Sequence, residues 1–264
     1  MKKKVKVAAL QYQTPKDYHE GERKVGKFVS KASKKNVDIV GLPEECLGQV
    51  NNNDKPLEFL SSIAKKYGVY LFGATYLYSG KRIRNVGFLF DGKGKLIIVQ
   101  DKIVLTPPAI KEGFKAGMTI KVVDTEFGRL ALLVCKDSFH RYAAWFFDKL
   151  MKFGVDIVLI PSSSITVSER SINLWTDTVK TMSMLFNVFI IAPGTVGKDN
   201  NSHTRSFGHA LIVDPQMVVL AEGSKDKEEV LYATLNKANL DRLRSPEASK
   251  WQPESVPKFK VERL

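Results

Sequence analysis

Short apolar runs alternate with longer, charged segments along most of this 264-residue chain. An apolar run of four to eight residues is typical of a buried strand, and apolar residues spaced three or four apart predict an amphipathic helix. Because strand–helix units place helices on the faces of a sheet, the alternation predicts an α/β fold. The turn sequence Asp91-Gly92-Lys93-Gly94 predicts a hairpin, so some strands should be antiparallel.

The predicted elements follow one another without a linker or a shift in composition, so we expect a single domain over 1–264. The segment 245–264 has three prolines and little periodicity, and we expect an extended C-terminal arm there. Strands are predicted at 5–11, 37–42, 69–76, 85–90, 95–100, 120–123, 130–134, 156–160, 188–192, 209–213, 217–221 and 230–235, and helices near 20–36, 56–67, 141–153, 169–186 and 237–244.

The composition argues against several classes of protein. No apolar run approaches the roughly 20 residues that span a bilayer, and the start, Met1-Lys2-Lys3-Lys4, lacks the features of a signal peptide. We therefore expect a cytoplasmic protein without membrane association. The net charge of +13 would suit nucleic acid, but the lysines are spread along the chain and no nucleic-acid motif accompanies them. Nucleic-acid binding is therefore not expected.

One cysteine stands where a nucleophile can be held. Cys135 closes the apolar run 130–134 and is followed by Lys136. A thiol at the end of a buried strand is held rigidly, and a neighbouring cation lowers its pKa and keeps it partly ionised. The alternative is a core cysteine, because free cysteine is among the most buried residue types. Cys46 is expected to pack in the core, and both thiols are expected to be reduced.

Two other predicted strands end in charged residues. Glu44 follows the strand 37–42 and a proline, which places its carboxylate at the rim of a sheet. Lys102 follows the second strand of the hairpin. Each residue alone has a simpler interpretation, as a surface carboxylate or an ordinary lysine at the edge of a sheet.

Together these three side chains would make a hydrolytic centre. Glu44 would take the proton of the Cys135 thiol and return it to a leaving amine. The Lys102 ammonium would stabilise the oxyanion, with the backbone N–H of Lys136 as a second donor. No spacing of cysteine or histidine suits a metal site, so a structural zinc site is not expected.

The same segments resemble the nitrilase, or carbon–nitrogen hydrolase, superfamily over nearly the full length of the chain. The resemblance rests on several motifs in the family's order. They are the opening strand at 5–11, Leu42-Pro43-Glu44, the Lys-x-x-Leu motif at Lys102, the Cys-x-Asp motif at Cys135, the strands within 154–161 and 187–192, and the signature at 206–215, where Ala210 replaces the usual serine.

This resemblance implies a four-layer α-β-β-α sandwich of the nitrilase type. Two such sandwiches usually pack through helices into a homodimer, often with the C-terminal arm on the partner. The implied chemistry is attack by Cys135 on an amide or nitrile carbon, an acyl-thioester intermediate and hydrolysis by water, without a cofactor. The leading interpretation is an amidase that releases ammonia from a small amide.

Three alternatives remain. A nitrilase or an N-carbamoyl hydrolase would use the same fold and the same groups. A member without turnover would act as a binding or scaffold protein. A metal-dependent nuclease or phosphatase would need clustered Asp, Asn and His ligands at strand ends, and the chain offers few.

Two departures from the family pattern bear on the site. Glu112, five residues before Gly117, is the candidate for the family's second glutamate, with the role of orienting Lys102 or holding the attacking water. The Phe-Pro-Glu that often follows the cysteine motif is replaced by Phe139-His140-Arg141. This change keeps the aromatic ring and adds cations.

We therefore expect Lys136, Phe139 and Ser162 to bind the substrate. Our hypothesis is that Lys136, His140 or Arg141 favours a substrate with a carboxylate or another anion. The alternative is that these cations face solvent or a dimer interface. Ser162 opens a stretch of small hydroxylated residues, which suits either a polar substrate or the start of the next helix.

Overall fold

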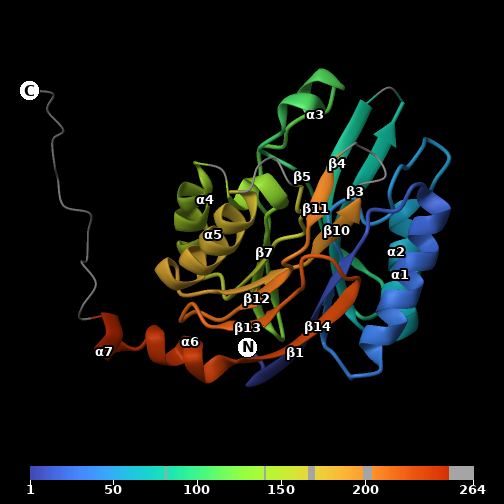
Figure 1. Cartoon of the computed structure of the whole chain (residues 1–264). Helices are drawn as coiled ribbons and strands as arrows, with labels where there is room; N and C mark the ends of the chain where they lie inside the picture. The colour runs from blue at the N-terminus through green and yellow to red at the C-terminus, as the bar shows by residue number, and fades with distance from the viewer. Residues whose placement is uncertain (81, 140, 166–169, 199–203, 250–264) are drawn as a thin grey trace, which may run out of the picture.

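The computed structural model describes residues 1–80, 82–139, 141–165, 170–198 and 204–249. Its strands form two sheets (Figure 1). The eight-stranded sheet has the order β11 (Arg205–Phe207), β10 (Gly194–Lys198), β1 (Lys4–Tyr12), β2 (Ile39–Gly41), β3 (Tyr70–Ser79), β4 (Arg82–Phe90) and β5 (Leu96–Asp101), and β14 (Glu229–Asn236) also pairs with β1. The six-stranded sheet has the order β13 (Val219–Glu222), β12 (Leu211–Val213), β9 (Phe189–Ala192), β8 (Ile157–Leu159), β7 (Gly128–Leu132) and β6 (Val122–Thr125).

Helices cover the outer face of each sheet, which gives four layers (Figure 1). Helices α1 (Tyr18–Ser33) and α2 (Pro56–Tyr67) lie on the eight-stranded sheet, and α4 (Ala143–Met151) and α5 (Ser171–Leu185) lie on the six-stranded sheet. The short helices α3 (Pro107–Lys111), α6 (Lys237–Leu243) and α7 (Pro246–Ser249) lie outside these layers. The predicted α/β sandwich is therefore confirmed.

Three apolar layers hold the sandwich together. Alternation along β1 sends Val7 into the space between the sheets and Leu10 toward α1, as the period of two in a strand requires. Leu132 of β7 belongs to the same central layer as Val7, and Phe147 of α4 fills the layer outside the six-stranded sheet. Full burial of one such side chain stabilises the fold by about 1.5–3 kcal/mol.

Local sequence explains where the covering helices begin and end. Asp17 caps α1, because its side chain accepts a hydrogen bond from the Glu20 amide. Helix α2 begins at Pro56, whose missing N–H is no loss in a first turn. It ends at Gly68, which adopts the left-handed conformation with φ of 63°.

Four strand ends that carry polar residues meet at one rim. Strands β1, β2 and β3 are parallel, and β5 runs in the direction of β3 because β4 is antiparallel to both. In the other sheet β7, β8 and β9 are parallel. Gly87 of β4 lets the sheets approach, because a Cβ there would lie 2.2 Å from Leu132 Cδ2. Contacts of Ser162 with Glu44 and with Cys135 place the carboxyl ends of strands from both sheets at the same rim.

The structure adds elements that the sequence analysis did not predict. Strands β10 and β11 contain glycine and polar residues, and pairing of β10 with β1 and of β11 with β10 holds them extended. Helix α7 occupies 246–249, where we expected an extended arm, and 250–264 lies outside the described residues. Over the described ranges, every helix is too short or too polar to cross a bilayer.

Candidate active site

Glu44, Lys102 and Cys135 come together at the rim where the carboxyl ends of the strands meet. Lys102 Nζ donates a hydrogen bond to Glu44 Oε1 at 2.6 Å. The Glu44 amide donates to the Ser162 carbonyl at 3.2 Å, and Ser162 Oγ donates to Cys135 Sγ at 3.4 Å. This chain of contacts links the ends of β2, β5, β7 and β8 into one centre.

The carboxylate and the ammonium form a buried ion pair. Glu44 is 2% exposed and Lys102 is 5% exposed. Burial alone lowers the pKa of Lys102, but the charges of Glu44 and of a Cys135 thiolate raise it further, so the ammonium stays charged. Asn85 Nδ2 donates a second hydrogen bond to Glu44 Oε1, at 2.7 Å. Two donors on one oxygen compensate the desolvation that a buried carboxylate suffers.

The backbone of Cys135 is held in an uncommon conformation. Its φ is 47°, in the left-handed region that costs a residue other than glycine about 1–3 kcal/mol. Its amide donates to the Pro161 carbonyl at 2.9 Å, which ties the end of β7 to the end of β8. Cys135 also opens a short 3-10 turn, Cys135–Ser138. The turn places Cys135, a partly exposed residue, at the rim.

The surroundings of the Cys135 thiol favour its protonated form. Burial and the Glu44 carboxylate raise its pKa to about 12, although the Lys102 ammonium, the Ser162 hydroxyl and the Ser163 amide act in the opposite direction. This corrects the expectation that a neighbouring cation keeps the thiol partly ionised. A base must therefore remove the proton when the thiol attacks, and the adjacent Glu44 carboxylate is suited to do so.

Asp137 joins the cysteine turn to the loop after Lys102. Its carboxylate accepts hydrogen bonds from the amides of Val104 at 2.6 Å, Ile103 at 3.1 Å and Val134 at 3.2 Å. Burial raises the pKa of Asp137 to about 6 against the effect of these amides. Asp137 thereby holds Lys102 and the cysteine turn in register.

The 3-10 turn at Cys135–Ser138 contains one backbone N–H group that lacks a hydrogen-bond partner among the described residues. In the part of the chain that the structure describes, the Cys135 amide donates to Pro161 and the Asp137 amide donates to Val134. The Lys136 amide between them has no such partner among the described residues. An unpaired N–H in a first turn, next to a nucleophile, can donate to a developing oxyanion.

The geometry agrees with a comparison against known families. The model of the carbon–nitrogen hydrolase family matches residues 6–245. The chain belongs to the carbon–nitrogen hydrolase family. The resemblance to the nitrilase superfamily is thereby confirmed.

Curated relatives of this carbon–nitrogen hydrolase are distant but match most of the chain. The chain is 26% identical over 262 residues to "Hydrolase C26A3.11" of Schizosaccharomyces pombe, covering 91% of this chain and 79% of the relative. It is 24% identical to "Omega-amidase NIT3" of Saccharomyces cerevisiae, with 92% and 91% covered. It is 25% identical to "Deaminated glutathione amidase" of Yersinia enterocolitica, with 74% and 70% covered.

Solved structures share the fold of this carbon–nitrogen hydrolase. Saccharomyces cerevisiae Nit3, described as a member of branch 10 of the nitrilase superfamily, superposes with a TM-score of 0.81 at 23% identity, covering 96% of each chain. An amidase from Nesterenkonia sp. superposes with a TM-score of 0.78 at 19% identity, covering 94% and 96%. At these identities the likeness supports the fold alone.

The predicted substrate-binding residues of the hydrolase lie around Cys135. Ser162 contacts the sulfur and is 1% exposed. Phe139 packs edge-on against Trp175, with ring centroids 5.8 Å apart. The Lys136 ammonium is half-buried and donates to the Leu105 carbonyl at 3.5 Å. Arg141 lies on the surface, with its guanidinium over the Tyr142 ring. His140 lies outside the described residues.

Glu112 lies at the end of α3, on the loop that follows Lys102. Its side chain is exposed, and it acts electrostatically on the hydroxyl of Tyr76. The Lys102 ammonium donates to Glu44, and among the described residues no hydrogen bond joins it to Glu112. The structure therefore places Glu112 near the centre but outside the ion pair.

Two residues of the centre were missed in the sequence analysis. Asn85 holds Glu44, and its signal was a single amide at the start of the otherwise apolar run 86–90. Tyr76 of β3 is partly buried with its hydroxyl bonded to Glu45, and burial next to Glu45 and Glu44 raises the pKa of Tyr76. No signal in the sequence pointed to Tyr76, because it ends an ordinary strand pattern.

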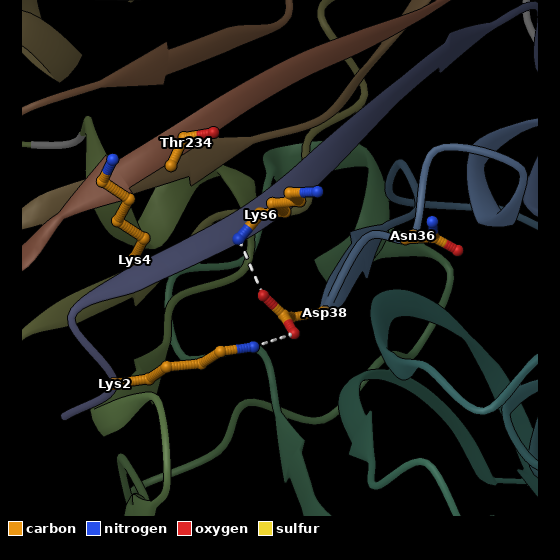
Figure 2. A pocket seen from close by; sticks show the side chains of 6 residues that line it. All are labelled: Lys2, Lys4, Lys6, Asn36, Asp38 and Thr234. Atoms are coloured by element: carbon orange, nitrogen blue, oxygen red, sulfur yellow. Dashed lines mark hydrogen bonds and ion pairs between the residues drawn. The ribbon is translucent and has the colours of Figure 1, made fainter.

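A surface hollow of about 470 Å³ lies at the opposite end of the sheet (Figure 2). Lys2 Nζ donates to one oxygen of Asp38 at 2.7 Å, and the other oxygen accepts from the Lys6 amide. Lys4 and Lys6 point in different directions in this view. The hollow lies at the amino ends of β1 and β2, whereas Glu44 follows the carboxyl end of β2, so the hollow is no part of the centre.

The described residues contain no group of three or more His, Cys, Asp or Glu side chains arranged to hold a metal ion. The centre itself offers one carboxylate, one ammonium and one thiol. The arrangement suits proton transfer and attack by sulfur.

Proposed function

We propose that this protein is a thiol amidase that hydrolyses a small amide to a carboxylic acid and ammonia. The observation that carries the proposal is the buried Glu44–Lys102 ion pair beside Cys135, a partly exposed residue at the rim. Burying an ion pair is costly, and a pair held next to a strained cysteine suits a catalytic role. The names of the relatives, an omega-amidase and a deaminated glutathione amidase, support the same class of substrate.

The groups of the centre account for each step. Glu44 accepts the thiol proton while Cys135 Sγ forms a bond to the amide carbon. The Lys102 ammonium and the Lys136 N–H stabilise the oxyanion. Glu44 returns the proton to the amine, the carbon–nitrogen bond breaks and ammonia leaves a thioester. Glu44 then takes a proton from a water molecule, whose oxygen forms a bond to the thioester carbon. The carbon–sulfur bond breaks, the carboxylic acid is released, and the proton held by Glu44 restores the thiol. A role of Glu112 in holding this water stays a prediction.

The substrate that we favour carries an anionic group in addition to the amide. Lys136 lies directly after the nucleophile, and its half-buried ammonium makes one long hydrogen bond among the described residues, to the Leu105 carbonyl at 3.5 Å. A substrate carboxylate would give this cation a stronger partner. Nitriles and N-carbamoyl compounds would use the same groups, so the same experiment must include them.

The test is ammonia release from a panel of half-amides of dicarboxylic acids, matched amides without the acid group, nitriles and ureido acids. We expect half-amides to be hydrolysed with the highest kcat/KM, at least about tenfold above the uncharged amides, from one added ion pair. Rapid quenching and mass measurement should detect an acyl group on Cys135. Preference for an uncharged amide would contradict the anionic substrate, and no release from any compound would favour a scaffold role.

We further propose that the enzyme is a homodimer formed through α4 and α5. Trp145 and Leu174 on these helices are 58% and 55% exposed, and Phe153 after α4 is 61% exposed. An apolar hollow of about 440 Å³ lies beside Trp145 and Phe153. Apolar surface gathered in this way is typical of a contact between subunits. The cytoplasmic location and the docking of 245–264 on a partner stay predictions.

Sedimentation velocity tests the dimer. We expect the parent to sediment at about twice its 29.6 kDa chain mass, and the double variant Trp145→Glu/Phe153→Glu to sediment as a monomer, because buried charge disfavours the contact. Val218→Glu is the matched control, since Val218 is 52% exposed on the β12–β13 turn. A parent that is monomeric, or a double variant that stays dimeric, would reject this interface.

A further inference from the structure

We propose that Asn85 is a positioning residue of the centre, whose amide N–H holds one oxygen of Glu44 so that the other oxygen exchanges the proton with Cys135. The inference rests on the proposed thiol amidase, whose base is Glu44. It adds a residue from β4, a strand that contributes no other group to the chemistry.

Asn85 and Lys102 converge on the same carboxylate oxygen. Asn85 Nδ2 lies 2.7 Å from Glu44 Oε1, and Lys102 Nζ lies 2.6 Å from it. No hydrogen bond among the described residues reaches Glu44 Oε2. Because both donors stabilise negative charge on Oε1, the unengaged Oε2 is the oxygen left to accept a proton. Partial rotation of the carboxylate would break both bonds, so the pair of donors fixes the plane of the carboxylate and leaves one of its two equivalent oxygens unengaged.

The backbone of Asn85 holds Lys102, the other member of the ion pair. Its carbonyl accepts a hydrogen bond from the Lys102 amide at 2.9 Å. This bond continues the β4–β5 ladder one position past Val86–Asp101. One residue therefore holds the carboxylate through its side chain and the lysine through its main chain. The relative position of the two charges depends on a single rigid strand.

The side-chain oxygen of Asn85 indicates that the hydrogen bond to Glu44 determines the orientation of the Asn85 amide group. Asn85 is 6% exposed, and its Oδ1 has no hydrogen-bond partner among the described residues. A buried acceptor without a partner is destabilising, and such groups are rare in folded proteins. Turning the amide over would set Oδ1 against Glu44 Oε1, which places two acceptors in contact. The structure thus tolerates one unpaired oxygen in order to keep the donor on Glu44.

Two variants separate positioning from folding. Asn85→Ala removes the donor, and we expect kcat to fall about 10- to 100-fold with KM within about twofold, since a charge-assisted hydrogen bond is lost. Asn85→Asp keeps the shape but sets a second carboxylate beside Glu44. Asn239→Ala is the matched control, because Asn239 Nδ2 donates to Asp214 at 3.0 Å in a part of the fold that lacks the centre. The control should keep the parent kcat.

The pH dependence supplies a readout that a purely structural role would not move. The titratable and charged groups around Glu44 are Lys102, Cys135 and Tyr76, together with Glu45 next in the chain. In Asn85→Asp, two neighbouring carboxyl groups disfavour double ionisation. We expect the acid limb of kcat/KM to move up by about one pH unit or more, and alkylation of Cys135 by iodoacetamide to require higher pH.

The alkylation measurement needs no amide substrate, so it separates this inference from the proposed function. Cys135→Ala gives the background from Cys46. A shifted alkylation profile in Asn85→Asp supports the placement of Asn85 even if the parent hydrolyses no amide in the panel. An unshifted profile in Asn85→Asp, or a parent-like kcat in folded Asn85→Ala, would overturn it.

Discussion

Replacing Cys135 by alanine is expected to lower kcat for amide hydrolysis by at least about 10⁴-fold, the scale on which nucleophile removal acts in other hydrolases. The reason is that the carbon–sulfur bond of the acyl-enzyme cannot form, while Glu44 and Lys102 remain in place. The fold should survive, because alanine at a φ of 47° is no more strained than cysteine. The measurement is steady-state ammonia release under the conditions that suit the parent best.

A matched control is available in the same chain. Cys46 is a second free cysteine, fully buried in the apolar core beneath α1 and α2. Cys46→Ala removes the same type of thiol from that core and should reduce stability while kcat stays close to that of the parent. Ammonia release that persists in Cys135→Ala would show that Cys135 is not the nucleophile, whatever the result for Cys46→Ala.

Replacing Lys102 by methionine is expected to lower the free energy of unfolding by about 3–5 kcal/mol at pH 7 and to abolish turnover. Lys102 and Glu44 are almost fully buried, so the loss of the ammonium leaves a carboxylate without its counter-charge. The deficit should shrink as the pH falls through the range in which carboxyl groups protonate, because a neutral Glu44 no longer needs a counter-charge. Urea denaturation at several pH values measures this.

A double variant and a surface control complete the test. Glu44→Gln/Lys102→Met removes both charges and should recover most of the lost stability without recovering turnover. Lys55→Met removes the same type of side chain from the exposed pair with Glu58 and should change stability little. Equal destabilisation by Lys102→Met at pH values of about 4 and 8 would show that an unpaired carboxylate is not the cause.

The agreement between expectation and structure is closest at the ends of strands. Glu44, Lys102 and Cys135 each follow an apolar run, and each lies at the same rim in the structure. An apolar run followed by proline or a charged residue predicts where a strand stops, and the directions of the strands then bring those ends together. Strands β10 and β11 were missed because pairing of β10 with β1 and of β11 with β10, not local pattern, holds them extended.

Proximity in the sequence did not identify the cation that acts on the Cys135 thiol. Lys136 is next to Cys135 in the chain, but its ammonium reaches the Leu105 carbonyl, and the cation that acts on the thiol is Lys102. Burial and the Glu44 carboxylate outweigh that cation, so the pKa of Cys135 rises to about 12. Asn85 was missed for a related reason, since a lone amide in a strand does not indicate which carboxylate it will contact.

The sequence by itself therefore determined the alternation of strands and helices, the strand ends that carry Glu44, Lys102 and Cys135, and the membership in the family, because these depend on residues near one another in the chain. Only the tertiary structure decided that Glu44 and Lys102 pair away from water, that Asn85 and Lys102 donate to the same carboxylate oxygen, and that burial raises the pKa of the thiol. Those properties depend on distances between segments remote in the chain and on the exclusion of solvent. A local sequence pattern predicts neither of these.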